Sequence, residues 1–235
     1  MKKHLLVCII FLLLFSISQF YGEAEQTVSF YAGTGSDSGF VDKNSVSLEW
    51  IYTLSAEYFD LVGGARFTSS SADFSFEGKL FKSFLNDAIK FSGGATLHSS
   101  FINDEAFLQD SFIIAAVDFS LKPIFTSYGI IGGVGFNNTH VYQLPGIWIN
   151  EFYPIIRTYI KVDIMDKFCI GASLSNHTFF IYDFWSPKAE FWADVKLSDK
   201  FDASGCLTIR YTPNASNENI QIEGMDFKLG VKYEF

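Results

Sequence analysis

Strict alternation of apolar and polar side chains is the feature that most constrains the fold of this chain. In the last eight residues, KLGVKYEF, Leu229, Val231 and Tyr233 alternate with Gly230 and Lys232. A period of two places successive side chains on opposite faces of a β-strand, one apolar and one polar. The sequence therefore predicts strands with one apolar face.

The same reading extends over most of the chain. About twelve segments qualify, and most are close to the roughly 9–11 residues that cross a bilayer as a tilted strand. They are 26–34, 45–54, 59–69, 73–82, 89–98, 111–122, 126–137, 151–163, 168–177, 188–197, 201–211 and 222–235. Short connections after even-numbered segments and often longer ones after odd-numbered segments are typical of outer-membrane barrels. We therefore expect an all-β fold, a single antiparallel up-and-down transmembrane β-barrel of about twelve strands, with about ten as the alternative.

The final strand also resembles the C-terminal signal of bacterial outer-membrane β-barrel proteins. In that family a polar residue, a glycine and two hydrophobic residues occupy fixed positions, which are filled here by Lys228, Gly230, Tyr233 and Phe235. The resemblance is porin-like and identifies no specific family. It implies that the barrel-assembly machinery reads this segment and that the segment becomes the closing strand.

The N-terminus has the features of an export signal. Two lysines precede the apolar run Leu5–Phe15, and small or polar residues follow it. The run is too short for a membrane-spanning helix, which needs about 20 residues. We expect residues 1–24 to be a signal peptide, cleaved after about Gly22 or Ala24, and residues 25–235 to be the barrel.

Composition favours a lipid-facing surface. Hydrophobic residues make up 49% of the chain and charged residues only 18%, whereas soluble domains have about 25% charged residues. The net charge of -9 argues against nucleic acid as a partner.

Cys169 and Cys206 remain after cleavage. One strand separates them, so their Cα atoms should be about 9–10 Å apart. A disulfide needs less than about 7 Å, so we expect two free thiols.

The polar strand faces carry many ionisable side chains. Because the apolar faces must meet lipid, these charges are expected to line the lumen. They are Glu49, Glu77, Lys79, Asp118, Lys122, Arg157, Lys161, Asp163, Glu190, Asp194, Arg210, Asp226 and Lys228. Both signs occur, so ion pairs such as Arg157 with Glu190 or Asp163 are expected. Since about eight strands give a filled lumen and sixteen or more a water channel, a narrow pore and a closed lumen both remain open.

Aromatic and acidic residues are distributed unevenly along the strands. Outward aromatics should form two girdles at the membrane boundaries. One ring comprises Phe59, Phe91, Phe119, Phe168, Phe201, Tyr233 and Phe235, and the other Phe67, Phe74, Phe112, Phe136, Phe152 and Tyr211.

Acidic residues gather in or near the long connections and lysines toward the short turns, so any conductance should favour cations at low salt. The apolar connection 138–150 has three interpretations: a constriction of the pore, a contact with a partner, or a membrane anchor, of which we favour the last.

Glycine and other small residues recur in the middle of the odd-numbered segments. Examples are Gly33, Gly132, Gly133 and Gly171. We interpret them as sites that relieve strand curvature rather than as ligand contacts.

One pair of residues raises the possibility of catalysis. His98 and Ser100 have the His-x-Ser spacing that outer-membrane phospholipase A and the lipid A deacylases use on a barrel strand. The family's polar residues after the serine are missing, since Phe101 follows it, and His98 is expected to face the lumen. We therefore expect no enzyme. His98, His140 and His177 share no ligand spacing, so neither a metal nor another cofactor is expected.

These observations favour a passive, porin-like channel for small solutes. Outer-membrane lipid and the barrel-assembly machinery are its expected partners, and the oligomeric state is open. The alternatives are a structural or surface-recognition barrel with a closed lumen and, third, a lipid-modifying hydrolase of the outer membrane.

Overall fold

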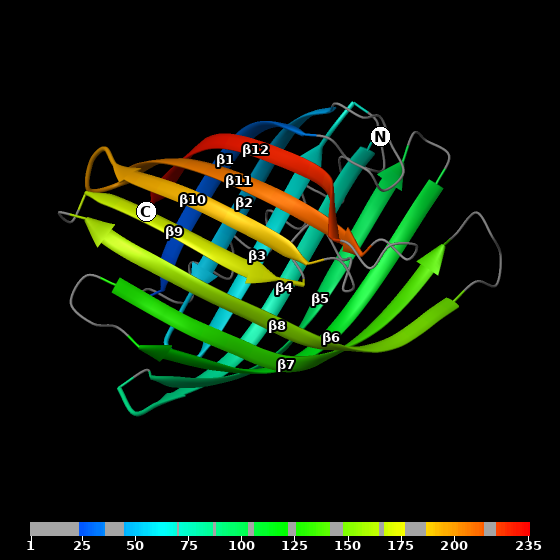
Figure 1. Ribbon diagram of the computed structural model, residues 1–235, viewed down its shortest axis with the longest axis horizontal. Helices are drawn as coiled ribbons and strands as arrows, with labels where there is room; N and C mark the ends of the chain where they lie inside the picture. Colours follow the sequence, from blue (N-terminus) through cyan, green and yellow to red (C-terminus); the bar gives the residue numbers. More distant parts are fainter. Residues whose placement is uncertain are drawn as a thin grey trace.

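The fold consists of β-strands joined by short and long connections. The structure is a computed structural model that describes residues 24–35, 45–69, 71–86, 88–102, 106–121, 126–141, 148–164, 167–176, 187–213 and 220–235. Twelve strands lie within these ranges (Figure 1). They are β1 (Glu25–Gly35), β2 (Ser45–Ser55), β3 (Phe59–Phe67), β4 (Ser71–Phe84), β5 (Ile89–Ile102), β6 (Ala106–Leu121), β7 (Thr126–Val141), β8 (Trp148–Ile164), β9 (Phe168–Ser175), β10 (Lys188–Lys196), β11 (Phe201–Pro213) and β12 (Ile220–Glu234). The predicted count of twelve is confirmed, and the alternative of ten is wrong.

The strands close into a barrel. Each strand pairs antiparallel with its neighbour in the chain, and β1 pairs with β12 from Thr27↔Glu234 to Gly35↔Asp226. Every described strand thus has a paired neighbour on both sides, the arrangement that a bilayer requires of a sheet. The predicted antiparallel up-and-down topology is confirmed. In the part of the chain that is described, no helix is long and apolar enough to cross a membrane.

Two hairpins are longer than the sequence predicts. The segments 99–110 and 138–150 were expected to be outer loops, but β5 and β6 pair as far as Ile102↔Ala106 and β7 and β8 as far as His140↔Trp148. This part of the prediction is wrong because it ended strands where apolar alternation stops. Backbone pairing needs no apolar face, and it continues through polar positions such as Asn138↔Asn150.

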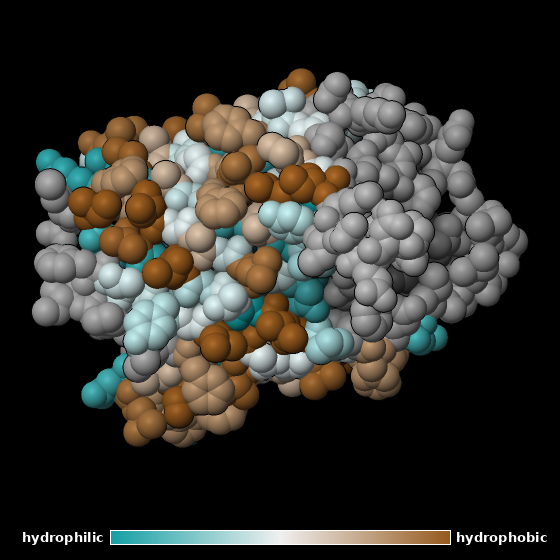
Figure 2. Space-filling model, viewed as in Figure 1, coloured by the Kyte–Doolittle hydropathy of each residue, from teal (hydrophilic) through white to brown (hydrophobic). Residues whose placement is uncertain are grey.

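The outer face of the barrel is apolar. On β12 the outward side chains Phe227, Leu229 and Val231 are 47%, 57% and 45% exposed. Figure 2 shows such hydrophobic side chains spread over the described part of one side of the molecule. A surface of this kind is favourable against lipid and unfavourable in water.

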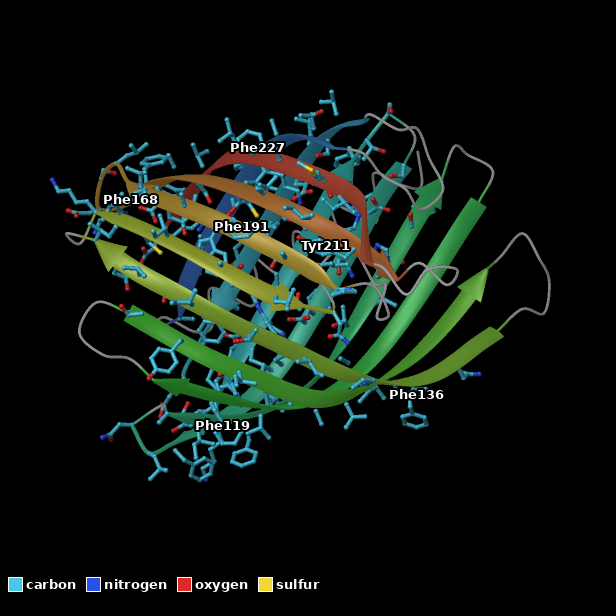
Figure 3. The ribbon with its side chains drawn as sticks, in the orientation of Figure 1. Phe119, Phe136, Phe168, Phe191, Tyr211 and Phe227 are labelled. Carbon is cyan, nitrogen blue, oxygen red and sulfur yellow. The ribbon has the colours of Figure 1, made fainter. Side chains whose placement is uncertain are left out.

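Aromatic rings gather toward both ends of the outer face. Near the short turns, Phe201 and Tyr233 have ring centroids 4.7 Å apart, and near the other end Phe67 and Phe74 have centroids 5.9 Å apart. In Figure 3, Phe119 and Phe168 lie toward one end of the barrel and Phe136 and Tyr211 toward the other. Phe112 was wrongly assigned to the outer ring, since the register pairs it with Thr96 on the inner face.

A small hydrophobic cluster interrupts the exposed outer surface. Tyr52 and Leu54 are outward-facing residues of β2, but they are only 6% and 0% exposed. They pack against a group of partly buried hydrophobic side chains: Ala24, Val28, Trp50, Phe59, Leu61 and Phe76. The Tyr52 hydroxyl donates a hydrogen bond of 3.1 Å to Gln26.

Candidate functional site

The candidate site is the inner face of the barrel. Strand pairing fixes which residues share this face: Lys228 is opposite Gly33 on β1 and Cys206 on β11, and the set continues around the wall by steps of two residues. The register places these expected lumen charges on the inner face: Glu49, Glu77, Lys79, Asp118, Arg157, Lys161, Asp163, Glu190, Asp194, Arg210, Asp226 and Lys228. Lys122 lies outside the described residues, as do residues 1–23, the centre of loop 138–150 and His177.

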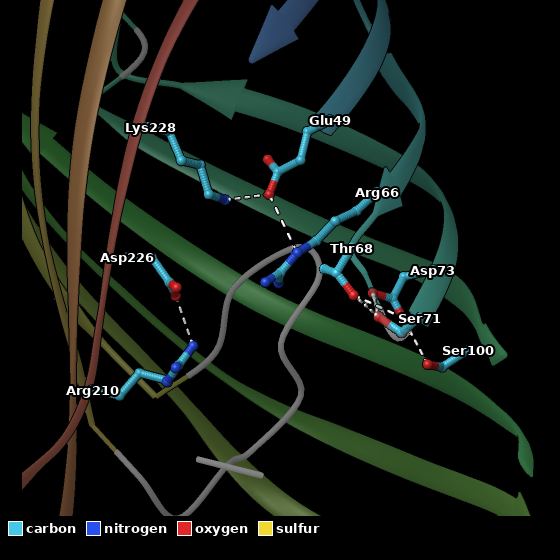
Figure 4. Close-up of polar contacts among 9 residues, drawn as sticks. All are labelled: Glu49, Arg66, Thr68, Ser71, Asp73, Ser100, Arg210, Asp226 and Lys228. Carbon is cyan, nitrogen blue, oxygen red and sulfur yellow. Dashed lines mark hydrogen bonds and ion pairs between the residues drawn. The ribbon is translucent and has the colours of Figure 1, made fainter. Parts of the chain in front are cut away.

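A three-membered ion cluster joins β12, β2 and β3. Lys228 Nζ lies 2.6 Å from Glu49 Oε1, and Arg66 Nε lies 3.6 Å from the same oxygen (Figure 4). Lys228 and Glu49 are two strands apart, with Gly33 of β1 between them. A Cβ on Gly33 would come within 2.9 Å of Lys228 Cγ. The glycine therefore gives the lysine side chain room to cross β1.

A second ion pair is almost fully shielded from solvent. Arg210 Nη1 donates to Asp226 Oδ2 over 2.7 Å between β11 and β12 (Figure 4). The two residues are 3% and 6% exposed. A buried charge without its partner is strongly destabilising, so loss of either member should destabilise the barrel.

The inner face of β10 carries two further carboxylates. Asp194 accepts hydrogen bonds from Lys232 at 2.9 Å and from the Ser204 hydroxyl at 2.6 Å. Glu190 accepts one from the Ser173 hydroxyl at 3.2 Å, and Arg157 Nη2 lies 3.8 Å from it. Of the two partners expected for Arg157, Glu190 is the one that the structure places within ion-pair distance.

These carboxylates border a cavity of about 320 Å³ in the lumen. The floor is the inner face of β11, whose side chains here are small: Ser204, Cys206 and Thr208. Larger side chains stand on either side of it. They are Glu190, Trp192 and Asp194 on β10, and Asp226, Lys228 and Lys232 on β12. The short side chains of one strand between the long ones of its neighbours form a groove along the wall.

The suspected catalytic pair lies on this inner face, but the serine has a different partner. His98 and Ser100 are buried on β5 at 5% and 7% exposure. The Ser100 hydroxyl donates to Asp73 Oδ1 on β4, and the Ser71 hydroxyl donates to the other oxygen of Asp73 at 3.3 Å (Figure 4). The Ser100 proton is therefore directed at Asp73, which differs from the histidine–serine pair that the spacing suggested.

Several inner-face charges escaped the sequence analysis. They include Asp60, Arg66 and Asp73. A signal for them exists, because Asp60 and Arg66 are six residues apart on β3 and an even spacing places both on one face. The apolar character of β3 concealed it.

The C-terminal motif divides between the two faces. Lys228 and Gly230 are on the inner face, whereas Tyr233 and Phe235 belong to the outer set, where Phe235 is 61% exposed. Their rings lie 4.9 Å apart. The backbone N–H of Phe235 donates to Gln26 of β1 over 3.1 Å, so the final residue joins the seam of the barrel.

Both expected thiols are free and lie on the inner face. Cys206 is opposite Trp192, and Cys169 is opposite Asp194. Among the residues the structure describes, no group of three or more His, Cys, Asp or Glu side chains could hold a metal ion.

Comparison with solved structures agrees with this architecture. The NanC porin aligns with a TM-score of 0.58 and 10% sequence identity over 88% of this chain and 100% of that chain. The KdgM porin aligns with a TM-score of 0.54 and 10% identity over 89% and 99%. KdgM in complex with disordered oligogalacturonate gives a TM-score of 0.53 over the same shares, again with 10% identity. At this identity the likeness shows a shared fold.

Comparison of this sequence with known proteins finds no relative. No protein-family model matches this chain, and none of the curated proteins matches it.

Proposed function

We propose that this protein is an integral outer-membrane barrel that acts as a passive channel for small polar solutes. The observation that carries the proposal is the division between the two faces. Exposed hydrophobic side chains cover the outside, and paired charges surround a cavity of about 320 Å³ inside. A polar lumen within an apolar wall is the arrangement of membrane channels.

The two terminal segments support an export route. Residues 1–24 would direct secretion and be removed after about Gly22 or Ala24. Lys228, Gly230, Tyr233 and Phe235 would then present the folding chain to the barrel-assembly machinery. The pairing of β12 with β1 supports a closing role for this segment.

The solved relatives in fold support passage of solutes. NanC and KdgM are both described as porins, and KdgM has been solved with oligogalacturonate. The lumen of this chain has its own chemistry, with acids and bases paired along the wall, so the solute need not be the same.

Conductance of the purified protein in planar bilayers tests this proposal. We expect discrete current steps that are absent from a matched preparation lacking the barrel. Folded protein that inserts into the bilayer and carries no current would reject a channel and favour the closed structural barrel. Hydrolysis of outer-membrane phospholipid that is lost in Ser100→Ala would favour the lipid hydrolase.

A further inference from the structure

We propose that the lumen cavity above β11 is a binding subsite for a neutral polyhydroxylated ring, such as a free hexose, which stacks on Trp192. This inference rests on the channel function proposed above and names the class of solute that the channel retains during passage. Four features of the cavity carry it: an aromatic platform, a floor of short side chains, charges that are already paired, and its size.

The aromatic platform is held in place by a glycine. A Cβ on Gly171 would lie 2.1 Å from Cζ2 and 2.3 Å from Cε2 of Trp192, so the indole lies directly over this residue of β9. Gly171 and Trp192 are also register partners. An indole supported from behind by backbone offers its other face to the lumen, where Trp192 borders the cavity. Trp combines a large apolar face with a polar N–H, which suits a ring that has apolar C–H faces and a polar rim.

The floor offers short polar groups beside the platform, on β11. Cys206 is opposite Trp192, and Ser204 and Thr208 flank Cys206 along β11. The cavity exists because these three side chains are smaller than their neighbours on β10 and β12. A ring stacked on the indole would present its edge toward these hydroxyl groups of β11.

The state of the charges selects a neutral ligand. Glu49 is bound by Lys228, Asp194 by Lys232, and Asp226 by Arg210. The remaining charges of the lining, Arg157 and Glu190, lie 3.8 Å apart as a looser ion pair. A charged solute would compete with the existing partner of whichever group it approaches. A hydroxyl group only has to donate to a carboxylate lone pair that is still unused, because each carboxylate has about four acceptor sites. A neutral polyol therefore binds without breaking the network.

The size of the cavity limits the ligand to one ring at a time. Its volume of about 320 Å³ lies at the lower end of the roughly 300–1,000 Å³ of small-molecule sites. The Lys232–Asp194 ion pair crosses β11 beside Ser204 and bounds the groove at that level.

The two native thiols allow a direct test in the intact protein. Cys206 is in the floor of the cavity, whereas Cys169 is on the same inner face and does not border it. The full chain, purified from membranes and folded in detergent, is treated with the small neutral reagent methyl methanethiosulfonate, and peptide mass spectrometry follows each thiol separately. The reaction is repeated with D-glucose, with D-glucuronate, with D-glucosamine and with glycerol at equal concentration. Because both thiols are in one molecule, Cys169 corrects for changes in reagent or viscosity.

We expect glucose to slow modification of Cys206 several-fold and to leave Cys169 unchanged, with weaker protection by glucuronate, glucosamine and glycerol. Trp192→Ala should abolish the protection, and Trp192→Phe should keep part of it. Trp50→Phe, on the outer face of β2, is the matched control and should behave like the native protein. Gly171→Ala should weaken protection without removing the indole, because it displaces the platform.

Three results would overturn the subsite. They are a Cys206 that does not react even without sugar, equal protection of both thiols, or stronger protection by glucuronate or glucosamine than by glucose. Bilayer recording without sugar separates the two proposals. Current steps together with an unprotected Cys206 would leave the channel standing and remove the subsite.

Discussion

Glycine on the inner face of this barrel marks positions where a neighbouring side chain needs room. Lys228 crosses Gly33, the Trp192 indole lies over Gly171, and a Cβ on Gly230 would meet the ring of Tyr31 at 2.4 Å. The sequence analysis interpreted such glycines as relief of strand curvature. The contacts give Gly33 and Gly171 a second role, as gaps through which side chains of adjacent strands reach their partners.

The first prediction at this scale compares two glycine substitutions. In Gly33→Ala the new methyl group would lie 2.8 Å from the carbonyl oxygen of Phe227 and 2.9 Å from Lys228 Cγ. We expect a loss of about 1–3 kcal/mol in the free energy of unfolding, from overpacking and displacement of the lysine. Gly132→Ala is the control, since nothing lies within 4 Å of its Cβ position, and its effect should stay within about 0.5 kcal/mol. Urea unfolding in lipid vesicles measures both, and equal losses would contradict this role of Gly33.

The second residue-scale prediction concerns the shielded ion pair. Arg210→Met leaves the Asp226 carboxylate, which is 6% exposed, without its guanidinium partner. We expect the free energy of unfolding to fall by about 3–5 kcal/mol. Lys196→Met removes a surface pair with the fully exposed Asp199 and should change little. The same unfolding assay reports both variants. Equal stability of Arg210→Met and the native protein would mean that lumen water solvates Asp226.

Only some of the residues of the site could be predicted from the sequence. An even spacing between two residues of a strand indicates that their side chains share a face, and this is how Arg157, Glu190 and Asp194 were found. This spacing does not indicate which neighbour a long side chain reaches. The contact of Lys228 with Glu49 across β1 depends on the register of three strands and on the empty space at Gly33.

At the scale of strands, the alternation of apolar and polar residues predicts that a strand is present better than it predicts where the strand ends. The expected bounds of β2, 45–54, differ from the observed Ser45–Ser55 by one residue, because its alternation runs the full length. The hairpins β5–β6 and β7–β8 continue past the apolar positions. Their ends are set by backbone pairing with the adjacent strand, which leaves no local trace in side-chain polarity.

The closing strand gives the prediction at this scale. Removing Phe235 deletes an exposed ring that contacts Tyr233 and a backbone N–H that donates to Gln26 of β1. If the C-terminal motif is the assembly signal, the truncated chain should be exported normally but should insert poorly. Phe227→Ala is the control, since Phe227 is on the same strand and outer face but outside the motif. Folded barrel in outer-membrane fractions, compared with soluble periplasmic protein, is the readout. Normal insertion of the truncated chain would contradict the signal.

At the scale of the whole molecule, we expect charge to be distributed differently in the lumen and at the ends of the barrel. Within the described part of the lumen, acids and bases form pairs along the wall, including Glu49 with Lys228 and Asp194 with Lys232. Paired charges produce little net field along the axis. The chain as a whole nevertheless carries a net charge of -9, so the field that a permeating ion meets should come mainly from the ends of the barrel.

This difference predicts a cation preference that depends on ionic strength. A potassium chloride gradient across a bilayer should give a reversal potential of cation-selective sign near 0.1 M, where the Debye length is about 10 Å and acidic groups at a mouth act across its width. Near 1 M the length falls to about 3 Å, and the preference should largely disappear. An anion-selective sign would contradict the role of the acidic ends. A preference that persists unchanged at high salt would instead place the selecting charges within the narrow lumen, where an ion passes closer to the wall than salt can screen.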